Sequence, residues 1–105
     1  MPYIQAATLS DFEGTDRKYC ELTEDVQVAL FKHEDGSFYA IDVWCSHQKV
    51  SLINGERDDY EIMCPLHGAC FDIRTGQHQS FPAVRPVDGF SVKIDGDNIL
   101  VEVDE

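Results

Sequence analysis

Basic residues are scarce in this sequence. Its 105 residues include 8 Lys and Arg against 20 Asp and Glu, which gives a formal net charge of −12. A nucleic-acid-binding surface needs a cluster of cationic side chains that displaces counterions from phosphates, and an anionic membrane surface repels a chain of this charge. We therefore expect neither a nucleic-acid partner nor a membrane partner.

The sequence also lacks a long apolar run and a secretory signal. No stretch approaches the roughly 18 apolar residues of a membrane-spanning helix, and Met1–Gln5 has neither the basic nor the apolar segment of a signal peptide. The expected location is the cytoplasm, where reducing conditions disfavour disulfides. The four cysteines, Cys20, Cys45, Cys64 and Cys70, are therefore expected to bind metal or remain thiols.

Helical periodicity is nearly absent, and short β-favouring runs occupy most of the chain. Only Thr8–Gly14 resembles a helical turn, with a polar start and a terminal glycine. Apolar residues make up 43% of the sequence, enough for one small core. We predict an all-β fold, a sandwich or small barrel, in a single domain over residues 1–105. The predicted strands are Tyr3–Ala6, Lys18–Leu22, Val26–Lys32, Phe38–Val43, Tyr60–Met63, Phe71–Ile73, Phe90–Ile94 and Ile99–Val103.

Tight turns join several of these runs. Glu34–Ser37 and Asp95–Asn98 contain Asp-Gly, which supplies the positive backbone φ that a short hairpin needs, and Arg74–Gln77 is a similar turn. Apolar and polar residues alternate along Phe90–Ile94 and Ile99–Val103. The pattern predicts that the last two runs form a half-buried antiparallel pair.

Two clusters of soft metal ligands interrupt the strand pattern. They are Cys45-Ser46-His47 and Cys64-Pro65-Leu66-His67-Gly68, with 16 residues between His47 and Cys64. A structural zinc site usually takes two cysteines from one segment and two histidines from the other, whereas each segment here supplies one of each. This division suits a two-iron cluster in which the cysteines share one iron and the histidines share the other. A zinc-stabilised binding module remains an alternative.

Cys45-x-His47 and Cys64-Pro65-Leu66-His67-Gly68 resemble the ligand motif of the Rieske family, whose [2Fe-2S] cluster has two histidines in place of two cysteines on one iron. The resemblance implies that Cys45, His47, Cys64 and His67 bind one such cluster per chain. It also implies an antiparallel β-sandwich with a small cluster-binding subdomain of two ligand loops, at approximately residues 43–86.

Positions around the motif sort the chain within this family. Respiratory-complex Rieske proteins have two further cysteines, joined in a disulfide, where this sequence has Val50 and Leu66. They also have Ser and Tyr, which donate hydrogen bonds to sulfur, where Ala69 and Phe71 stand here. Hydrogen-bond donors to sulfur stabilise the reduced cluster and so raise its midpoint potential. Because Ala69 and Phe71 have no side-chain donor, we predict a midpoint potential toward the low end of the roughly −150 to +300 mV Rieske range.

The sequence most resembles the small Rieske ferredoxins of bacterial aromatic-ring-hydroxylating dioxygenase systems, which act in aromatic hydrocarbon catabolism. The resemblance implies an electron carrier rather than an enzyme. Its partners would be a flavin-containing, NAD(P)H-dependent ferredoxin reductase and a terminal Rieske oxygenase, and we expect it to be a monomer. The alternative within the family is a Rieske-like small subunit of a larger oxidoreductase, such as an assimilatory nitrite reductase.

The remaining candidate residues are given ordinary structural roles. Cys20 and Cys70 have no ligand at a comparable spacing, so we expect thiols that bind no metal. His33 and His78 are interpreted as surface histidines, and Asp58-Asp59 as solvated acidic surface. Ser80–Ala83 resembles the proline-containing loop that covers the cluster in this family.

Overall fold

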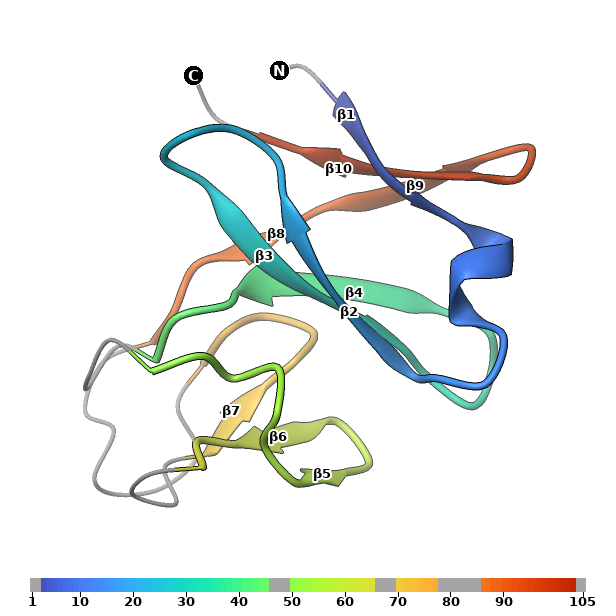
Figure 1. Cartoon of the computed structure of the whole chain (residues 1–105). Helices are drawn as coiled ribbons and strands as arrows, with labels where there is room; N and C mark the ends of the chain where they lie inside the picture. Colours follow the sequence, from blue (N-terminus) through green and yellow to red (C-terminus); the bar gives the residue numbers. More distant parts are fainter. Residues whose placement is uncertain (1–2, 46–49, 66–69, 78–85, 104–105) are drawn as a thin grey trace.

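The fold consists of three antiparallel β-sheets (Figure 1). The computed structural model describes residues 3–45, 50–65, 70–77 and 86–103. Within these residues, the first sheet has the order β1-β10-β9, the second β2-β3-β4-β8 and the third β5-β6-β7. The strands are β1 (Tyr3–Thr8), β2 (Arg17–Glu21), β3 (Gln27–Lys32), β4 (Phe38–Asp42), β5 (Arg57–Asp58), β6 (Glu61–Met63), β7 (Cys70–Asp72), β8 (Gly89–Phe90), β9 (Val92–Asp95) and β10 (Asn98–Glu102).

The second sheet is the middle layer of the molecule. Residues on β3 alternate between its two faces, as they do on any strand. Val28 and Leu30 pack in a core with Ala7, Ile99 and Val101 of the first sheet. The next residues along, Ala29 and Phe31, pack in a second core on the side of the third sheet. The run Val28–Phe31 is therefore buried on both faces, which explains why it is apolar without alternation.

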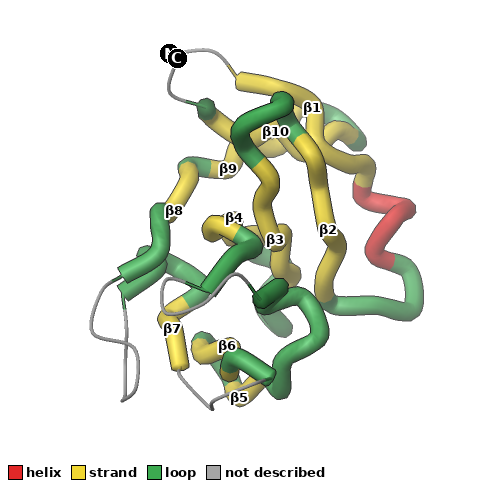
Figure 2. Tube along the Cα trace, turned by 60° about the vertical axis from the view of Figure 1, so that its left-hand side comes forward, coloured by secondary structure: helices red, strands yellow, loops and turns green. Residues whose placement is uncertain are grey.

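The third sheet, β5–β7, lies at the end of the molecule opposite the chain termini (Figure 1). It is joined to the middle layer through the core that contains Phe31, Ile62 and Phe71. Figure 2, turned by 60°, shows the same small sheet below β2, β3 and β4. The arrangement is a β-sandwich with a small additional sheet on its outer face.

The all-β prediction is confirmed. Apart from shifts of one or two residues at strand ends, the strands differ from those predicted at two places. The run Phe90–Ile94 is not one strand: β8 pairs with β4 in the second sheet, and β9 pairs with β10 in the first. The chain changes sheets at Ser91, whose carbonyl accepts a hydrogen bond from the N–H of Glu102 at 2.9 Å. Phe90 and Val92 still pack against the same core from different sheets, whereas Ile94, further along β9, is 45% exposed. Strand β5 has only two polar residues and was not predicted.

Helix is confined to one short turn in the described part of the chain. It is the 3-10 helix η1 (Leu9–Phe12), inside the predicted Thr8–Gly14, and the Asp11 carboxylate accepts a hydrogen bond from the N–H of Thr8 at 3.0 Å. No helix among the described residues is long and apolar enough to cross a membrane.

Candidate metal centre

Cys45 and Cys64 lie in the same buried cluster. Cys45 follows β4 and is 5% exposed, and Cys64 directly follows β6 and is 1% exposed. Both pack in the core that also contains Phe71 and Ile73. The fold therefore brings together two thiols that are 19 positions apart in the sequence (64 − 45 = 19) and shields both from water.

The predicted histidine ligands, His47 and His67, fall outside the described residues, as do His78 and Ser80–Ala83. Each histidine follows a described cysteine by two or three positions. Within the described residues no group of three or more His, Cys, Asp or Glu could hold a metal ion. The histidine half of the ligand set thus stays a prediction.

The thiol half of the site fits an iron–sulfur cluster chemically. Thiolates are soft ligands that iron–sulfur clusters use, and a dry apolar surround protects such clusters from solvent. Of the four cysteines, Cys45 and Cys64 lie together in this core. Cys20 instead lies in the other core, 4% exposed, where burial raises the pKa of its thiol to about 11. Cys70 is half-buried on β7, opposite Met63.

Residues 50–56 connect the two cysteine-bearing segments. The N–H of Cys45 donates to the carbonyl of Val50 at 2.9 Å, and the N–H of Leu52 donates to the carbonyl of Val43 at 2.6 Å. At the other end, the N–H of Met63, the residue before Cys64, donates to the carbonyl of Glu56 at 2.8 Å. This connecting segment, residues 50–56, therefore contacts the backbone beside both cysteines.

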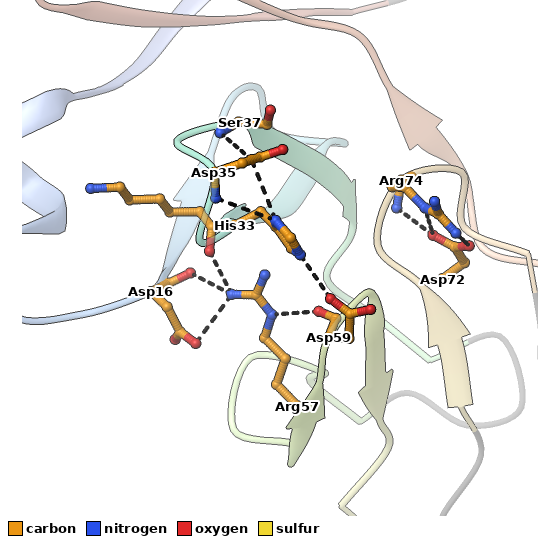
Figure 3. Close-up of polar contacts among 9 residues, drawn as sticks. Asp16, His33, Asp35, Ser37, Arg57, Asp59, Asp72 and Arg74 are labelled. Carbon is orange, nitrogen blue, oxygen red and sulfur yellow. Dashed lines mark hydrogen bonds and ion pairs between the residues drawn. The ribbon is translucent and has the colours of Figure 1, made fainter.

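Asp16, Arg17 and Arg57 attach the connecting segment and β5 to the sandwich, and Figure 3 shows the contact between Asp16 and Arg57. Asp16 accepts from Arg17 Nε at 2.9 Å through Oδ1 and from Arg57 Nη1 at 3.1 Å through Oδ2. Burial raises the pKa of Asp16, but the hydrogen bonds and charges of Arg17 and Arg57 outweigh burial and lower it. The Asp16 carboxylate is therefore held ionised between two guanidinium groups.

The sequence predicts that His33 is a surface histidine, but its side chain is largely enclosed. Its side chain is 11% exposed, and its ring stacks on Tyr60 with centroids 4.1 Å apart and an interplanar angle of 2°. Nε2 lies 2.8 Å from Asp59 Oδ1, and Nδ1 lies 3.3 Å from Asp35 Oδ1. Asp59 is 66% exposed, as expected of solvated acidic surface, but it also binds this histidine.

Sequence patterns do not reveal Asp16, Arg17, Arg57 or His33 as parts of one region. Apart from local pairs such as Asp16–Arg17 and His33–Asp35, the partners of their side chains lie 25 to 41 positions away, as for Arg57 with Lys32 and Asp16. The only local sign of this region is that Asp16, Arg17 and Arg57 lie at or directly before the first residue of a strand, where the chain passes from one sheet to the next.

The sequence is similar to a known domain family and to a characterised kind of subunit over most of its length. A family model described as a Rieske [2Fe-2S] domain matches residues 3–91. A 3-phenylpropionate/cinnamic acid dioxygenase ferredoxin subunit from Photorhabdus laumondii is 35% identical over 106 aligned residues, covering 100% of this chain and 98% of that protein.

Solved structures extend the likeness to the fold. The ferredoxin of carbazole 1,9a-dioxygenase from Nocardioides aromaticivorans IC177 matches with a TM-score of 0.87 and 34% identity, covering 96% of this chain and 97% of that one. A chain in a complex of reduced oxygenase and oxidized ferredoxin in carbazole 1,9a-dioxygenase matches with a TM-score of 0.86 and 27% identity, covering 94% and 91%. Each match spans nearly the whole chain.

Proposed function

This chain belongs to the Rieske [2Fe-2S] domain family, and we propose that it is the ferredoxin component of an aromatic-ring-hydroxylating dioxygenase system. The observation that carries the proposal is the full-length likeness to a dioxygenase ferredoxin subunit. The two buried cysteines in one core support it, because they supply the thiolates that the family's cluster needs. The chain transfers electrons and is not itself the catalyst.

Cys45, His47, Cys64 and His67 are the proposed ligands of one [2Fe-2S] cluster, in a cluster-binding subdomain of approximately residues 43–86. When bound, the cluster stores and releases a single electron. The protein holds the Cys45 and Cys64 thiolates away from water, since both residues are at most 5% exposed. Phe71, 0% exposed, covers the same core without offering a hydrogen-bond donor to sulfur.

The proposed partners follow from the relatives. A related chain occurs in a complex of oxygenase with ferredoxin, so the proposed electron acceptor is a terminal Rieske oxygenase. The proposed donor is a flavin-containing, NAD(P)H-dependent ferredoxin reductase. We propose a cytoplasmic monomer, because a carrier that docks alternately on two partners needs its transfer surface exposed. The oxygenase, not this chain, selects the aromatic substrate.

The cluster is tested by spectroscopy of the purified protein. We expect a red-brown protein with two irons and two sulfides per chain and, after reduction, the low average g value of mixed His/Cys ligation. Cys45→Ser and Cys64→Ser should lose this signal. The matched control, Cys20→Ser, removes a thiol from the other core and should keep it. A colourless wild-type protein with stoichiometric zinc would contradict the proposal.

The carrier role needs a second experiment. The protein is mixed with the reductase and oxygenase encoded beside its gene, and single-turnover reduction and reoxidation are followed optically. We expect both half-reactions to occur with the isolated chain. If the chain exchanges electrons only as a tightly bound subunit of a larger oxidoreductase, such as a nitrite reductase, the dioxygenase role is wrong while the cluster assignment stands.

A further inference from the structure

The connecting segment, residues 50–56, is packed so closely that it cannot shift without moving the cysteines. A Cβ atom added at Gly55 would lie 1.8 Å from the carbonyl oxygen of Met63, the residue before Cys64. The backbones therefore touch directly at this point. At the other end the segment is tied to Cys45 through the carbonyl of Val50. The position of this segment consequently sets the positions of both cysteine backbones.

Arg17 anchors the segment to the sandwich. It lies at the start of β2, and its Nη1 donates to the carbonyl of Ile53 at 3.1 Å and to the carbonyl of Gly55. The side chain is 23% exposed, so both hydrogen bonds are partly shielded from water. A planar guanidinium can hold several acceptors in a fixed geometry, which a lysine ammonium on a flexible chain cannot do as well.

Asp16 extends this anchor to the third sheet. The carboxylate that orients Arg17 also binds Arg57, whose side chain is 10% exposed. Arg57 begins β5, and its Nη1 also donates to the carbonyl of Lys32 at 2.6 Å, at the end of β3. One carboxylate thus links the connecting segment, through Arg17, and the small sheet, through Arg57, to the same corner of the sandwich. Figure 3 shows the Arg57 half of this arrangement.

We propose that Asp16, Arg17 and Arg57 form a positioning cluster that fixes the Cys45 and Cys64 thiolates relative to each other through the connecting segment and β5. The inference rests on the proposed function, because it takes these cysteines as ligands of the [2Fe-2S] cluster. None of the three side chains is a ligand. Their effect is to hold the ligand-bearing backbone in the geometry that retains the cluster and defines its electronic structure.

The test compares Arg17→Gln with Lys18→Gln in the holoprotein. Lys18 is the next residue of β2, and its Nζ lies 3.8 Å from Asp11, on the side of η1. Both variants lose one positive charge, but only the first releases the connecting segment. We expect Arg17→Gln to transfer iron to a chelator about 10-fold faster than the wild type, at the lower end of the effect of removing an outer-shell partner. Lys18→Gln should match the wild type.

The EPR g anisotropy and the midpoint potential of the cluster distinguish a change in ligand positions from a general loss of protein stability. Arg17→Gln should change the g anisotropy of the reduced cluster and shift its midpoint potential, whereas Lys18→Gln should change neither. Arg17→Lys keeps the charge but not the planar fork, so it should behave like Arg17→Gln. Wild-type spectra and iron release in Arg17→Lys would show that charge alone suffices, and would overturn the proposal.

Asp16→Asn provides a second variant if Arg17→Gln does not fold. It keeps the size of the side chain and removes the charge that holds both arginines, so smaller changes in the same direction are expected. The inference is wrong if both variants retain iron and give the spectra of Lys18→Gln. A wild-type protein without the Rieske signal would instead contradict the proposed function, so the two failures are distinguishable.

Discussion

His33 and Asp59 are 26 positions apart, and His33 Nε2 lies 2.8 Å from Asp59 Oδ1. The contact joins the end of the β3–β4 hairpin to the turn between β5 and β6, and so links the sandwich to the small sheet. The hydrogen bond to Asp59 is the largest cause of a raised His33 pKa, and Asp35 contributes in the same direction. Tyr60 stacks on the ring and Arg57 lies in the same surface cavity.

This contact predicts a pH dependence of stability. Because the His33 pKa is raised above 6.5 in the folded protein, its contribution is fully present below that pH and is lost as pH rises through the higher folded value. The thermal midpoint should therefore decrease as the pH rises above about 6.5 and through the raised pKa of His33. Asp59→Asn should flatten this part of the curve.

Asp59→Asn is a suitable variant because the backbone of Asp59 is left-handed, with φ of 55°. Asparagine tolerates this conformation as well as aspartate does, so the turn is preserved. An NMR titration of the His33 ring checks the cause directly. The pKa of His33 should drop toward its ordinary value in the variant, and an unchanged pKa would contradict the assignment.

The features that could be predicted from the sequence are those encoded by neighbouring residues, namely most strands, the tight turns and the cysteine–histidine motif. Alternating apolar residues and Asp-Gly turns located most strands, and Gly36 and Gly96 adopt φ of 90° and 63° as the turns require. The spacing of Cys45 and Cys64 from their neighbouring histidines indicated the family, which the comparisons confirm. Both signals lie within a few neighbouring residues of the chain.

The remaining features depend on long-range contacts. The switch between sheets at Ser91 is invisible in a sequence whose apolar alternation continues through it. Arg17 and Arg57 resemble ordinary surface cations until the fold brings Ile53, Asp16 and Lys32 to them. Such polar contacts across 25 or more positions follow no periodic rule, and only the folded structure reveals them.

Gly55 should tolerate no side chain. Its Cβ would meet a backbone carbonyl at 1.8 Å, so Gly55→Ala must push the connecting segment away from Met63. We expect a loss of about 3 kcal/mol in the free energy of unfolding and reduced iron content. Gly96→Ala is the control, since Gly96 has a positive φ but open space around it, and its cost should be about 1 kcal/mol. Equal losses in thermal unfolding would contradict the packing argument.

Phe71→Tyr should raise the midpoint potential. At this position the respiratory Rieske proteins have a tyrosine that donates to a cysteine sulfur, and Phe71 lies in the core with Cys45 and Cys64. A hydrogen bond contributes about 1 kcal/mol, and about 1.4 kcal/mol corresponds to 59 mV for one electron. We therefore expect a rise of about 40 mV. Phe12→Tyr adds the same hydroxyl to the other core and should leave the potential unchanged.

The net charge of −12 predicts salt-sensitive electron transfer. If the reductase presents a basic surface, attraction accelerates encounter and is screened as the Debye length shortens from about 30 Å at 0.01 M to about 3 Å at 1 M salt. The second-order rate of reduction by the reductase should then fall at least about 10-fold across this range. A rate independent of ionic strength would show that the charge serves solubility alone.

The position of the charge should also matter. Asp58 lies on β5, in the same part of the molecule as Cys64, whereas Glu24 lies in the hairpin between β2 and β3, at the opposite end (Figure 1). Asp58→Asn and Glu24→Gln each remove one exposed negative charge. Because steering depends on charge near the docking surface, Asp58→Asn should lower the low-salt rate more than Glu24→Gln, with the difference vanishing at high salt. Equal effects would mean that only the total charge acts, and that the small sheet does not face the partner.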